Sequence, residues 1–223
     1  MTITLAFDVY GTLIDTAGVT SSLEKHVGES AFRFSSIWRE KQLEYSFRRG
    51  LMQNYRKFSV CTREALEYTC KTMDVELSSA DKNALMLEYR KLPAFADAAE
   101  ALPRLQSAGF RLYAFSNGPA EDVTALLENA GIAGYFQDVV STDEIKSFKP
   151  NPAVYAHFLR KSGATGSEAW LVSGNPFDVI GAISAGMRGA WIRRLETTVF
   201  DPWEIDPTVT VKTLTELENT LQR

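Results

Sequence analysis

From about residue 97 onward, short apolar runs alternate with stretches that have the apolar spacing of helices. The apolar runs, which we expect to be strands, are 110–115 (FRLYAF), 138–140, 169–172 (AWLV) and 190–192 (AWI). The helix-like stretches are 97–107, 120–129 and 152–162, with a further one after Phe177, and glycines that could end helices stand at Gly109, Gly131 and Gly186. Strands that alternate with helices are typical of a doubly wound parallel sheet. With an N-terminal run at 3–9, the pattern predicts an α/β, Rossmann-like core of five or more strands.

The N-terminal run has the alternation of a strand with one buried face, because Ile3, Leu5 and Phe7 alternate with smaller or polar residues. The run ends at Asp8 and is followed at once by a glycine turn at Gly11. Open parallel sheets bind ligands at the carboxyl ends of their strands. Asp8 is therefore the first candidate functional residue.

Residues 16–92 have a different pattern, with apolar residues at helical spacing and no segment that indicates a strand. The apolar positions are Phe34, Trp38 and Tyr45, then Leu66, Cys70 and Met73, then Leu85, Tyr89 and Leu92. We expect a helical cap, inserted after the first strand, that covers the carboxyl edge of the sheet and helps to exclude water. The predicted organisation is a core of residues 1–15 and 93–223 with a cap of residues 16–92.

Length and charge limit the class of protein. A chain of 223 residues forms one domain, or one domain with a modest insertion. The net charge of −4 does not suggest binding to nucleic acid or to an anionic membrane, and no apolar run approaches the roughly 20 residues that span a bilayer. Cys61 and Cys70 lack CxxC spacing and are expected to be reduced thiols. We expect a cytoplasmic enzyme.

Polar residues follow four of the predicted core strands. Asp8 ends the first strand, Ser116-Asn117-Gly118 follows 110–115, Lys149-Pro150 lies in the loop after 138–140, and Ser173-Gly174-Asn175-Pro176-Phe177-Asp178 follows 169–172. Each motif alone is weak, since Ser-Asn-Gly is also a good turn and a lysine before a proline is usually exposed. In a parallel sheet, however, all four would converge on one crevice.

The order Asp-x-x-Gly-Thr, Ser-Asn, Lys-Pro and terminal Asp resembles the haloacid dehalogenase superfamily. The cap run Trp38-Arg39-x-Lys41-Gln42-Leu43-Glu44-Tyr45 is similar to that of its L-2-haloacid dehalogenase branch. The resemblance covers nearly the whole chain. It implies a Rossmann-like core with an inserted helical cap, and hydrolysis of short L-2-haloalkanoic acids to 2-hydroxy acids with inversion at C2. It also implies no cofactor and no metal, a 2-halocarboxylate as the small-molecule partner, and a homodimer.

Tyr10 distinguishes between branches of the superfamily. The phosphatases of this superfamily have a second Asp two residues after the nucleophile, as general acid, and bind Mg²⁺. A halide leaving group needs no proton, so Tyr10 is consistent with carbon–halogen chemistry. Mg²⁺ prefers hard oxygen ligands, and the last motif offers few of them beyond Asp178. Neither His26 nor His157 adjoins a motif, so a histidine-based metal site is not expected either.

The resemblance implies a role for each polar residue. Asp8 attacks C2 and forms an aspartyl ester, which water then hydrolyses at its acyl carbon. An ionised Asp8 in a covered cleft needs a cationic partner, for which Lys149 is the natural candidate. The hydroxyls of Thr12 and Ser116 would hold the nucleophile and, with amides after Asp8, the substrate carboxylate. The remaining predicted catalytic residues, which would orient Lys149 and the water, are Ser173, Asn175 and Asp178, with Asp178 as candidate general base.

Arg39 is a candidate on separate grounds. On a helix, its neighbours at i±3 and i±4 include no acidic residue, and Leu43 and Phe47 continue its stripe at i+4 and i+8. A cation at the edge of an apolar face fits the halide-binding role that the family implies, with Asn117 assisting. The predicted apolar wall around C2 consists of Tyr10, Leu43, Phe58, Phe177 and, one turn after Lys149, Tyr155. The family commonly has tryptophan where this chain has Phe177.

Other interpretations of these residues remain open. Asp8 could cap a turn, Lys149 and Arg39 could be surface cations, and Asp178 could simply begin the next helix. A metal-independent relative could use the same attack to open a strained cyclic imino acid. A small-molecule phosphatase and a non-enzymatic binding protein are the remaining alternatives.

Overall fold

The computed structural model describes residues 2–221, and a six-stranded parallel sheet lies at its centre. The strands are β1 (Thr4–Asp8), β2 (Arg111–Ser116), β3 (Asp138–Ser141), β4 (Ala169–Ser173), β5 (Arg188–Ile192) and β6 (Val209–Val211). Their order across the sheet is β3-β2-β1-β4-β5-β6, so the first strand of the chain is central. The predicted α/β fold class is confirmed.

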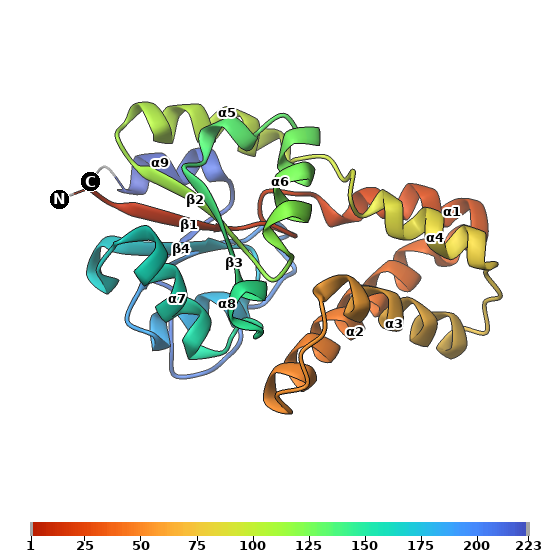
Figure 1. The fold of residues 1–223 in the computed structure, drawn as a ribbon. Coiled ribbons are helices and arrows are strands. Elements are labelled where there is room, and N and C mark those ends of the chain that lie inside the picture. Colours follow the sequence, from red (N-terminus) through yellow and green to blue (C-terminus); the bar gives the residue numbers. More distant parts are fainter. Residues whose placement is uncertain (1, 222–223) are drawn as a thin grey trace.

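Helices cover both faces of the sheet (Figure 1). Helices α5 (Ala96–Ser107), α6 (Ala120–Asn129) and α9 (Leu214–Leu221) pack on one face, and α7 (Pro152–Ser162) and α8 (Pro176–Ser184) pack on the other. In β1, Leu5 and Phe7 face the first group and Ala6 faces the second. The prediction that this strand has one exposed face is therefore wrong, because a central strand of a doubly wound sheet is buried on both faces.

The predicted elements of the core form with small shifts at their ends. Gly109, Gly131 and Gly186 adopt φ values of +88°, +72° and +87°, which end helices α5, α6 and α8 in the left-handed conformation that glycine favours. Helix α8 begins at Pro176, slightly earlier than expected, because proline suits the first helical position. The short β6 and α9 were not among the predicted elements.

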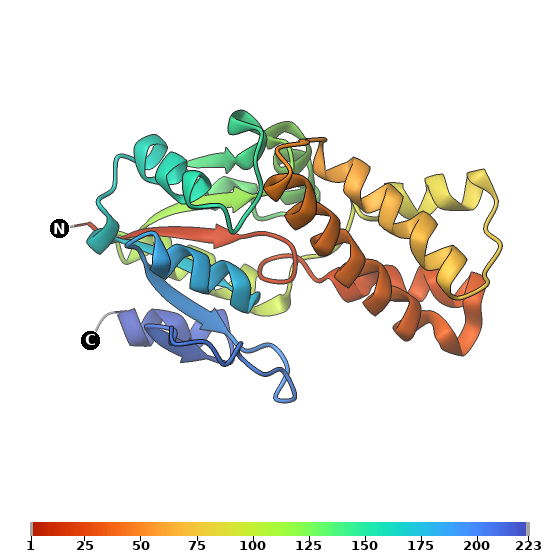
Figure 2. The ribbon, with the colours of Figure 1, turned by 90° about the horizontal axis from the view of Figure 1, so that it is seen from below.

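Four helices lie beyond the carboxyl ends of the strands, as Figures 1 and 2 show from two directions. They are α1 (Thr20–Val27), α2 (Ala31–Leu51), α3 (Phe58–Thr72) and α4 (Ser79–Glu88), and the described residues between 16 and 92 contain no strand. The chain enters and leaves this group through two adjacent segments. Asp15 N–H donates to the Pro93 carbonyl at 2.9 Å, and Phe95 N–H donates to the Leu13 carbonyl at 2.8 Å.

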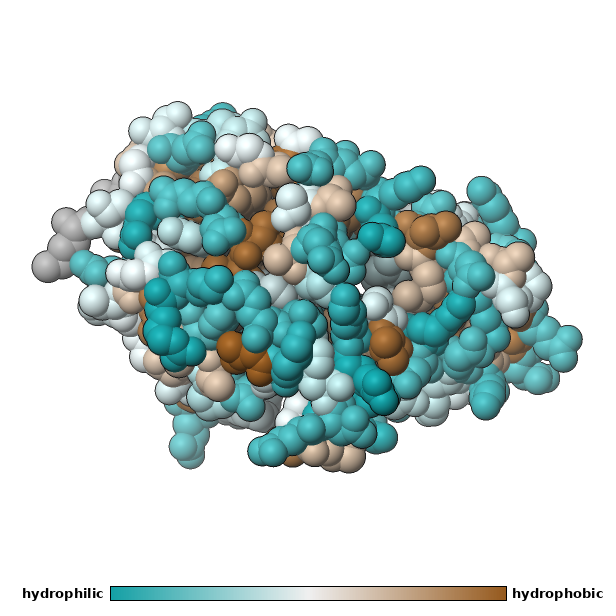
Figure 3. Space-filling model, viewed as in Figure 1, coloured by the Kyte–Doolittle hydropathy of each residue, from teal (hydrophilic) through white to brown (hydrophobic). Residues whose placement is uncertain are grey.

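Most of the surface on the face drawn in Figure 3 is hydrophilic, and hydrophobic residues appear there in separate small groups. Among residues 2–221, no helix is both long enough and apolar enough to cross a membrane. The two cysteines, Cys61 and Cys70, are free and buried.

Candidate active site

The carboxylate of Asp8, at the carboxyl end of β1, has two oxygens with different surroundings. Oδ2 accepts hydrogen bonds from Thr12 Oγ1 at 2.9 Å, Ser173 Oγ at 3.2 Å and Asn175 Nδ2 at 2.7 Å. Oδ1 has one partner, the Nζ of Lys149 at 3.2 Å. The three donors occupy Oδ2, so Oδ1 is the oxygen that remains available for reaction.

These donors are themselves held by backbone groups. Thr12 Oγ1 accepts from Gly174 N–H at 2.8 Å, and Ser173 Oγ accepts from Asn175 N–H at 3.0 Å. A side chain at Gly174 would meet the Gly11 carbonyl at 2.5 Å, so only glycine lets the loops after β1 and β4 approach this closely. The geometry around Asp8 therefore depends on two loops that are far apart in sequence.

Lys149 is the cation at the centre of the site, and its side chain is 1% exposed. Its Nζ donates to Asp8 Oδ1, to the Phe115 carbonyl at 2.8 Å and to Asp178 Oδ2 at 2.7 Å. The other oxygen of Asp178, Oδ1, accepts from the Tyr155 hydroxyl at 2.7 Å. All three ammonium hydrogens thus have acceptors, and both oxygens of Asp178 have donors.

Burial and the neighbouring charges shift the pKa values of Asp178 and Lys149 in opposite directions. Burial raises the pKa of Asp178 to about 6, although Lys149 opposes the shift. Burial alone would lower the pKa of Lys149, but the neighbouring Asp178 and Asp8 carboxylates outweigh it and raise that pKa. Burial also raises the pKa of Tyr155 well above its usual value, so its phenol stays protonated and donates to Asp178.

The turn after β2 lies beside Asp8. Ser116 Oγ accepts from Gly118 N–H at 3.1 Å, and Asn117 Oδ1 accepts from the Lys149 backbone N–H at 2.9 Å. The amide oxygen of Asn117 also accepts from Thr142 Oγ1 at 3.3 Å. Ser116 and Asn117 are both almost completely buried. The two bonds of Asn117 connect the turn to the loop that carries Lys149.

Helix α2 presents Arg39 to the core. Arg39 Nη1 donates to Gln42 Oε1 at 2.8 Å, and Nη2 donates to the Tyr10 carbonyl at 3.3 Å. None of the described carboxylates forms an ion pair with Arg39. Leu43 and Phe47 follow on the same stripe, and the Phe47 ring packs edge-on against Phe177 with 4.9 Å between centroids. The site therefore holds a cation whose charge no neighbouring carboxylate neutralises.

A small, partly open hollow of about 270 Å³, hereafter the inner cavity, lies between α2 and the strand ends. Ten residues line it: Asp8, Tyr10, Arg39, Leu43, Phe58, Ser116, Asn117, Lys149, Asn175 and Phe177. All ten were candidates from the sequence. The structure therefore brings together residues from four loops of the sheet and from helices α2 and α3.

Four other candidates do not line the inner cavity. Thr12 and Ser173 lie behind Asp8, where both donate to its Oδ2. Asp178, fully buried, lies behind Lys149. Tyr155 was expected in the wall around C2, but it lies still deeper and bonds to Asp178, because its ring packs into the core against Phe115.

The donor set is a poor fit to a divalent metal. The two carboxylates of Asp8 and Asp178 both contact the Lys149 ammonium group, and Tyr10 carries no carboxylate. Among residues 2–221, no group of three or more His, Cys, Asp or Glu side chains could hold a metal ion. A cation between Asp8 and Asp178 would have to displace Lys149.

Sequence reasoning missed the role of Gln42. Its side chain is 1% exposed, accepts from Arg39 and donates from Nε2 to Thr62 Oγ1 at 2.6 Å. The signal was present: Gln42 lies four residues after Trp38, on the stripe of α2 that packs against α3. A polar residue on a buried stripe requires a partner.

Comparison with known proteins agrees with this geometry. Residues 4–186 match the family model of the haloacid dehalogenase-like hydrolases. The chain is 37% identical over 190 residues to haloacetate dehalogenase H-2 of Moraxella sp. (strain B), which covers 85% of each chain. It is 33% identical over 217 residues to (S)-2-haloacid dehalogenase 2 of Pseudomonas sp. (strain CBS-3), or 97% of this chain and 94% of that one.

The fold of this chain is similar to a solved structure over nearly the whole length of both proteins. The L-2-haloacid dehalogenase from Xanthobacter autotrophicus with chloropropionic acid covalently bound has a TM-score of 0.93 and 31% identity, and the match covers 100% of this chain and 99% of that chain. These matches extend across both the sheet and the helices α1–α4. The chain belongs to the haloacid dehalogenase-like hydrolase family and, within it, to the branch of the L-2-haloacid dehalogenases.

Proposed function

We propose that this protein hydrolyses short L-2-haloalkanoic acids to 2-hydroxy acids, with inversion at C2 and an aspartyl ester on Asp8 as intermediate. The observation that carries the proposal is the asymmetry of the Asp8 carboxylate. Three donors hold Oδ2, whereas Oδ1 accepts a hydrogen bond only from Lys149, and Asp8 is one of the residues that line the inner cavity. A carboxylate oxygen that is fixed beside a hollow is suited to in-line attack on carbon.

In the first step, Asp8 Oδ1 forms a bond to C2 while the carbon–halogen bond breaks and the halide takes the electron pair. Arg39 receives the developing negative charge, with Asn117 beside it, because no carboxylate competes for the guanidinium group. Ser116 and the backbone amides after Asp8 hold the substrate carboxylate. Tyr10, Leu43, Phe58 and Phe177 surround C2 and exclude water from it.

In the second step, water attacks Cγ of Asp8, and negative charge develops on Oδ2. The three donors Thr12, Ser173 and Asn175 already surround that oxygen, so they form an oxyanion hole for this step. Collapse of the tetrahedral intermediate breaks the bond between Cγ and Oδ1, and the departing Oδ1 takes the remaining proton of the added water. The 2-hydroxy acid is released and Asp8 is a carboxylate again. The oxygen added to the product is the original Oδ1, so the inversion at C2 is kept.

Asp178 is the proposed acceptor for the proton of the attacking water, and it acts through Lys149. Its carboxylate is fully buried and contacts the ammonium group, not the inner cavity. In the ester, Asp8 has lost its charge, so Lys149 loses one of the two carboxylates that raise its pKa. A proton can then pass from Lys149 to Asp178 while Lys149 takes one from water.

The proposal also covers the division of the chain into domains, its location in the cell and its oligomeric state. We propose a core of residues 1–15 and 93–223 and a cap of residues 16–92, since the two connecting segments bond to each other at Leu13–Phe95 and Asp15–Pro93. We also propose a cytoplasmic location, which the free thiols support. A homodimer is proposed because Leu51 and Met52, at the end of α2, expose 87% and 63% of their surface.

The test is halide release from L- and D-2-chloropropionate, with and without EDTA. We expect release from the L form only, unaffected by the chelator, and none from the Asp8→Asn variant. A single turnover in ¹⁸O-water should label Asp8 before the product, as mass spectrometry of the peptide would detect. Label that enters the product directly would contradict the ester intermediate.

Three outcomes would favour other functions. Ring-opened amine from a strained cyclic imino acid, without halide release from any 2-haloacid, would favour the ring-opening hydrolase, which uses the same attack by Asp8. Mg²⁺-dependent hydrolysis of an aryl phosphate would favour a phosphatase, against which Tyr10 argues. Function that survives Asp8→Asn would indicate a binding protein.

A further inference from the structure

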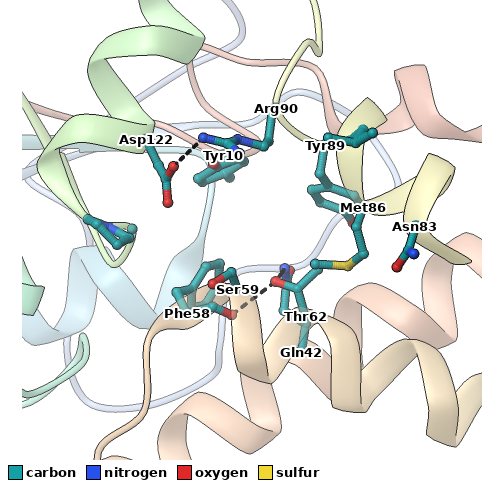
Figure 4. A pocket seen from close by; sticks show the side chains of 13 residues that line it. Tyr10, Gln42, Phe58, Ser59, Thr62, Asn83, Met86, Tyr89, Arg90 and Asp122 are labelled. Atoms are coloured by element: carbon teal, nitrogen blue, oxygen red, sulfur yellow. Dashed lines mark hydrogen bonds and ion pairs between the residues drawn. The ribbon is translucent and has the colours of Figure 1, made fainter.

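A second and larger hollow, hereafter the outer pocket, lies between the cap helices and the core (Figure 4). It encloses about 1120 Å³ including its open mouth, compared with about 270 Å³ for the inner cavity. Its walls come from α2, α3, α4 with the residues after it, the turn before α6 with the start of that helix, and Tyr10 in the loop after β1. The mechanism proposed above uses none of this space.

The outer pocket adjoins the inner cavity. The rings of Tyr10 and Phe58 line both hollows, with 6.2 Å between their centroids. Gly118, which follows the catalytic turn, also lines the outer pocket, and a Cβ there would lie 3.9 Å from the Tyr10 ring and 3.1 Å from Val123. Tyr10 and Phe58 therefore belong to the walls of both hollows.

The polar groups of the outer pocket largely pair with each other. Gln42 Nε2 donates to Thr62 Oγ1 at 2.6 Å. Arg90 forms an ion pair with Asp122 at 2.7 Å, which a dashed line marks in Figure 4. What remains is mainly the carbon surface of Tyr10, Phe58, Met86, Leu87, Tyr89 and Pro119. Paired polar groups gain little from a charged ligand, whereas exposed carbon surface gains from any apolar group that covers it.

We propose that the outer pocket is a subsite for the hydrocarbon chain of 2-haloalkanoic acids longer than 2-chloropropionate. This inference rests on the proposed function. The inner cavity would hold the carboxylate, C2 and the halogen, and the chain from C3 onward would pass the rings of Tyr10 and Phe58. Met86 projects into the pocket from α4 and contributes a flexible apolar side chain to its wall (Figure 4).

The first measurement is kcat/KM for the (S)-2-chloroalkanoates from propionate to octanoate. Each buried methylene should raise kcat/KM about fourfold until the chain reaches the mouth of the pocket, through a lower KM. 2-Chloroadipate, with a carboxylate at the far end, should be a much poorer substrate than 2-chlorohexanoate. Values of kcat/KM that stay level or fall from propionate to hexanoate would overturn the subsite, as would a preference for the adipate.

The second measurement uses Met86→Trp, which fills the pocket. The ratio of kcat/KM for 2-chlorohexanoate to that for 2-chloropropionate should fall at least tenfold. Ala84→Trp is the matched control, because it adds the same ring to an exposed position of α4 outside the pocket. An unchanged ratio in Met86→Trp, or an equal fall in the control, would contradict the proposal.

Binding of carboxylic acids that carry no halogen tests the subsite independently of the proposed reaction. Calorimetric titration with propionate, hexanoate and octanoate should give affinities that rise with chain length in the natural protein. Met86→Ala should preserve that order, and Met86→Trp should abolish it. If no 2-haloacid is turned over, the proposed function fails and this titration still decides the subsite. Equal affinities for all three acids would overturn it.

Discussion

The Asp178 carboxylate and the Lys149 ammonium group form an ion pair of 2.7 Å, in which both side chains are almost completely removed from solvent. Burial raises the pKa of Asp178 to about 6 even with this partner. Asp178 contacts Lys149, which in turn contacts the proposed nucleophile Asp8. An acid group with a pKa of about 6 in this position should control how activity depends on pH.

Replacement of Tyr155 by Phe should move that pH dependence. The Tyr155 hydroxyl donates to Asp178 Oδ1 and favours the charged carboxylate, so its loss should raise the pKa of Asp178 further. A hydrogen bond to a charged group contributes about 1.5 kcal/mol, which corresponds to roughly one pH unit. The acid limb of kcat against pH should therefore shift upward by about one unit.

The matched control for this variant is Tyr113→Phe. Tyr113 is a buried tyrosine on β2, and among the described residues no hydrogen bond joins it to Asp178. Its variant should keep the natural acid limb. If both variants lose activity equally at every pH, Tyr155 acts only through stability and not through Asp178.

Asp178 should also make stability depend on pH with an unusual sign. Its folded pKa of about 6 lies above its unfolded value, so the folded state binds more protons between about pH 4 and 6. This group therefore stabilises the fold at low pH, and its contribution is lost as pH rises through about 6. The change is roughly 3 kcal/mol at most.

Urea unfolding of the natural protein and of Asp178→Asn, between pH 4.5 and 7.5, isolates this contribution. As pH falls, the unfolding free energy of the natural protein should rise relative to that of Asp178→Asn, because the amide of the variant cannot take up a proton. A constant difference across that range would mean that the folded pKa of Asp178 is not raised.

The strands and helices of the core could be predicted because each has a periodic apolar pattern and a turn signal at its end. The burial of β1 on both faces was missed, since the small residue Ala6 and the polar Thr4 gave the appearance of an exposed face. Helix α9 and strand β6 are short, and β6 is stabilised by pairing with β5, which no local pattern indicates.

The sequence could predict which residues belong to the site, but not which of them line the inner cavity and which lie behind it. Motif positions indicate which residues reach the carboxyl edge of the sheet, and all ten residues of the inner cavity were candidates. Whether a side chain faces the cavity or lies behind it depends on tertiary packing. Tyr155 and Asp178 lie in the deeper position for that reason. The outer pocket depends on how helices α2, α3 and α4 pack against the loops at the strand ends, and no local sequence pattern indicates that packing.

Asn175→Ala should separate the two chemical steps. Loss of its 2.7 Å hydrogen bond to Asp8 Oδ2 removes one donor from the proposed oxyanion hole, where one donor contributes about 100-fold to rate. That loss should slow ester hydrolysis more than ester formation. Rapid quench should then detect a burst of halide, close to one per active site, followed by slow turnover.

The adduct on Asp8 should be visible by intact mass spectrometry during that slow phase. Asn129→Ala, an exposed asparagine at the end of α6, should give natural kinetics. Slow turnover of Asn175→Ala without a burst and without adduct would mean that Asn175 serves the first step instead.

Gln42→Met should disturb Arg39 without any change to Arg39 itself. Gln42 accepts from Arg39 Nη1 at 2.8 Å and is fixed by Thr62, so methionine of similar length removes the acceptor that orients the guanidinium group. Loss of buried hydrogen bonds should destabilise the fold by about 1–3 kcal/mol. The same substitution at the exposed Gln106 should leave activity unchanged and should alter stability by no more than about 0.5 kcal/mol.

The dependence of kcat on the leaving halide distinguishes a role in orienting Arg39 from a purely structural role of Gln42. Arg39 is proposed to receive the halide, and a small halide ion concentrates its charge and gains most from a well-placed donor. kcat for 2-chloropropionate should therefore fall about tenfold or more in Gln42→Met, whereas kcat for 2-iodopropionate should fall less. An equal fall for both halides would indicate that Gln42 only stabilises the packing of α2 against α3.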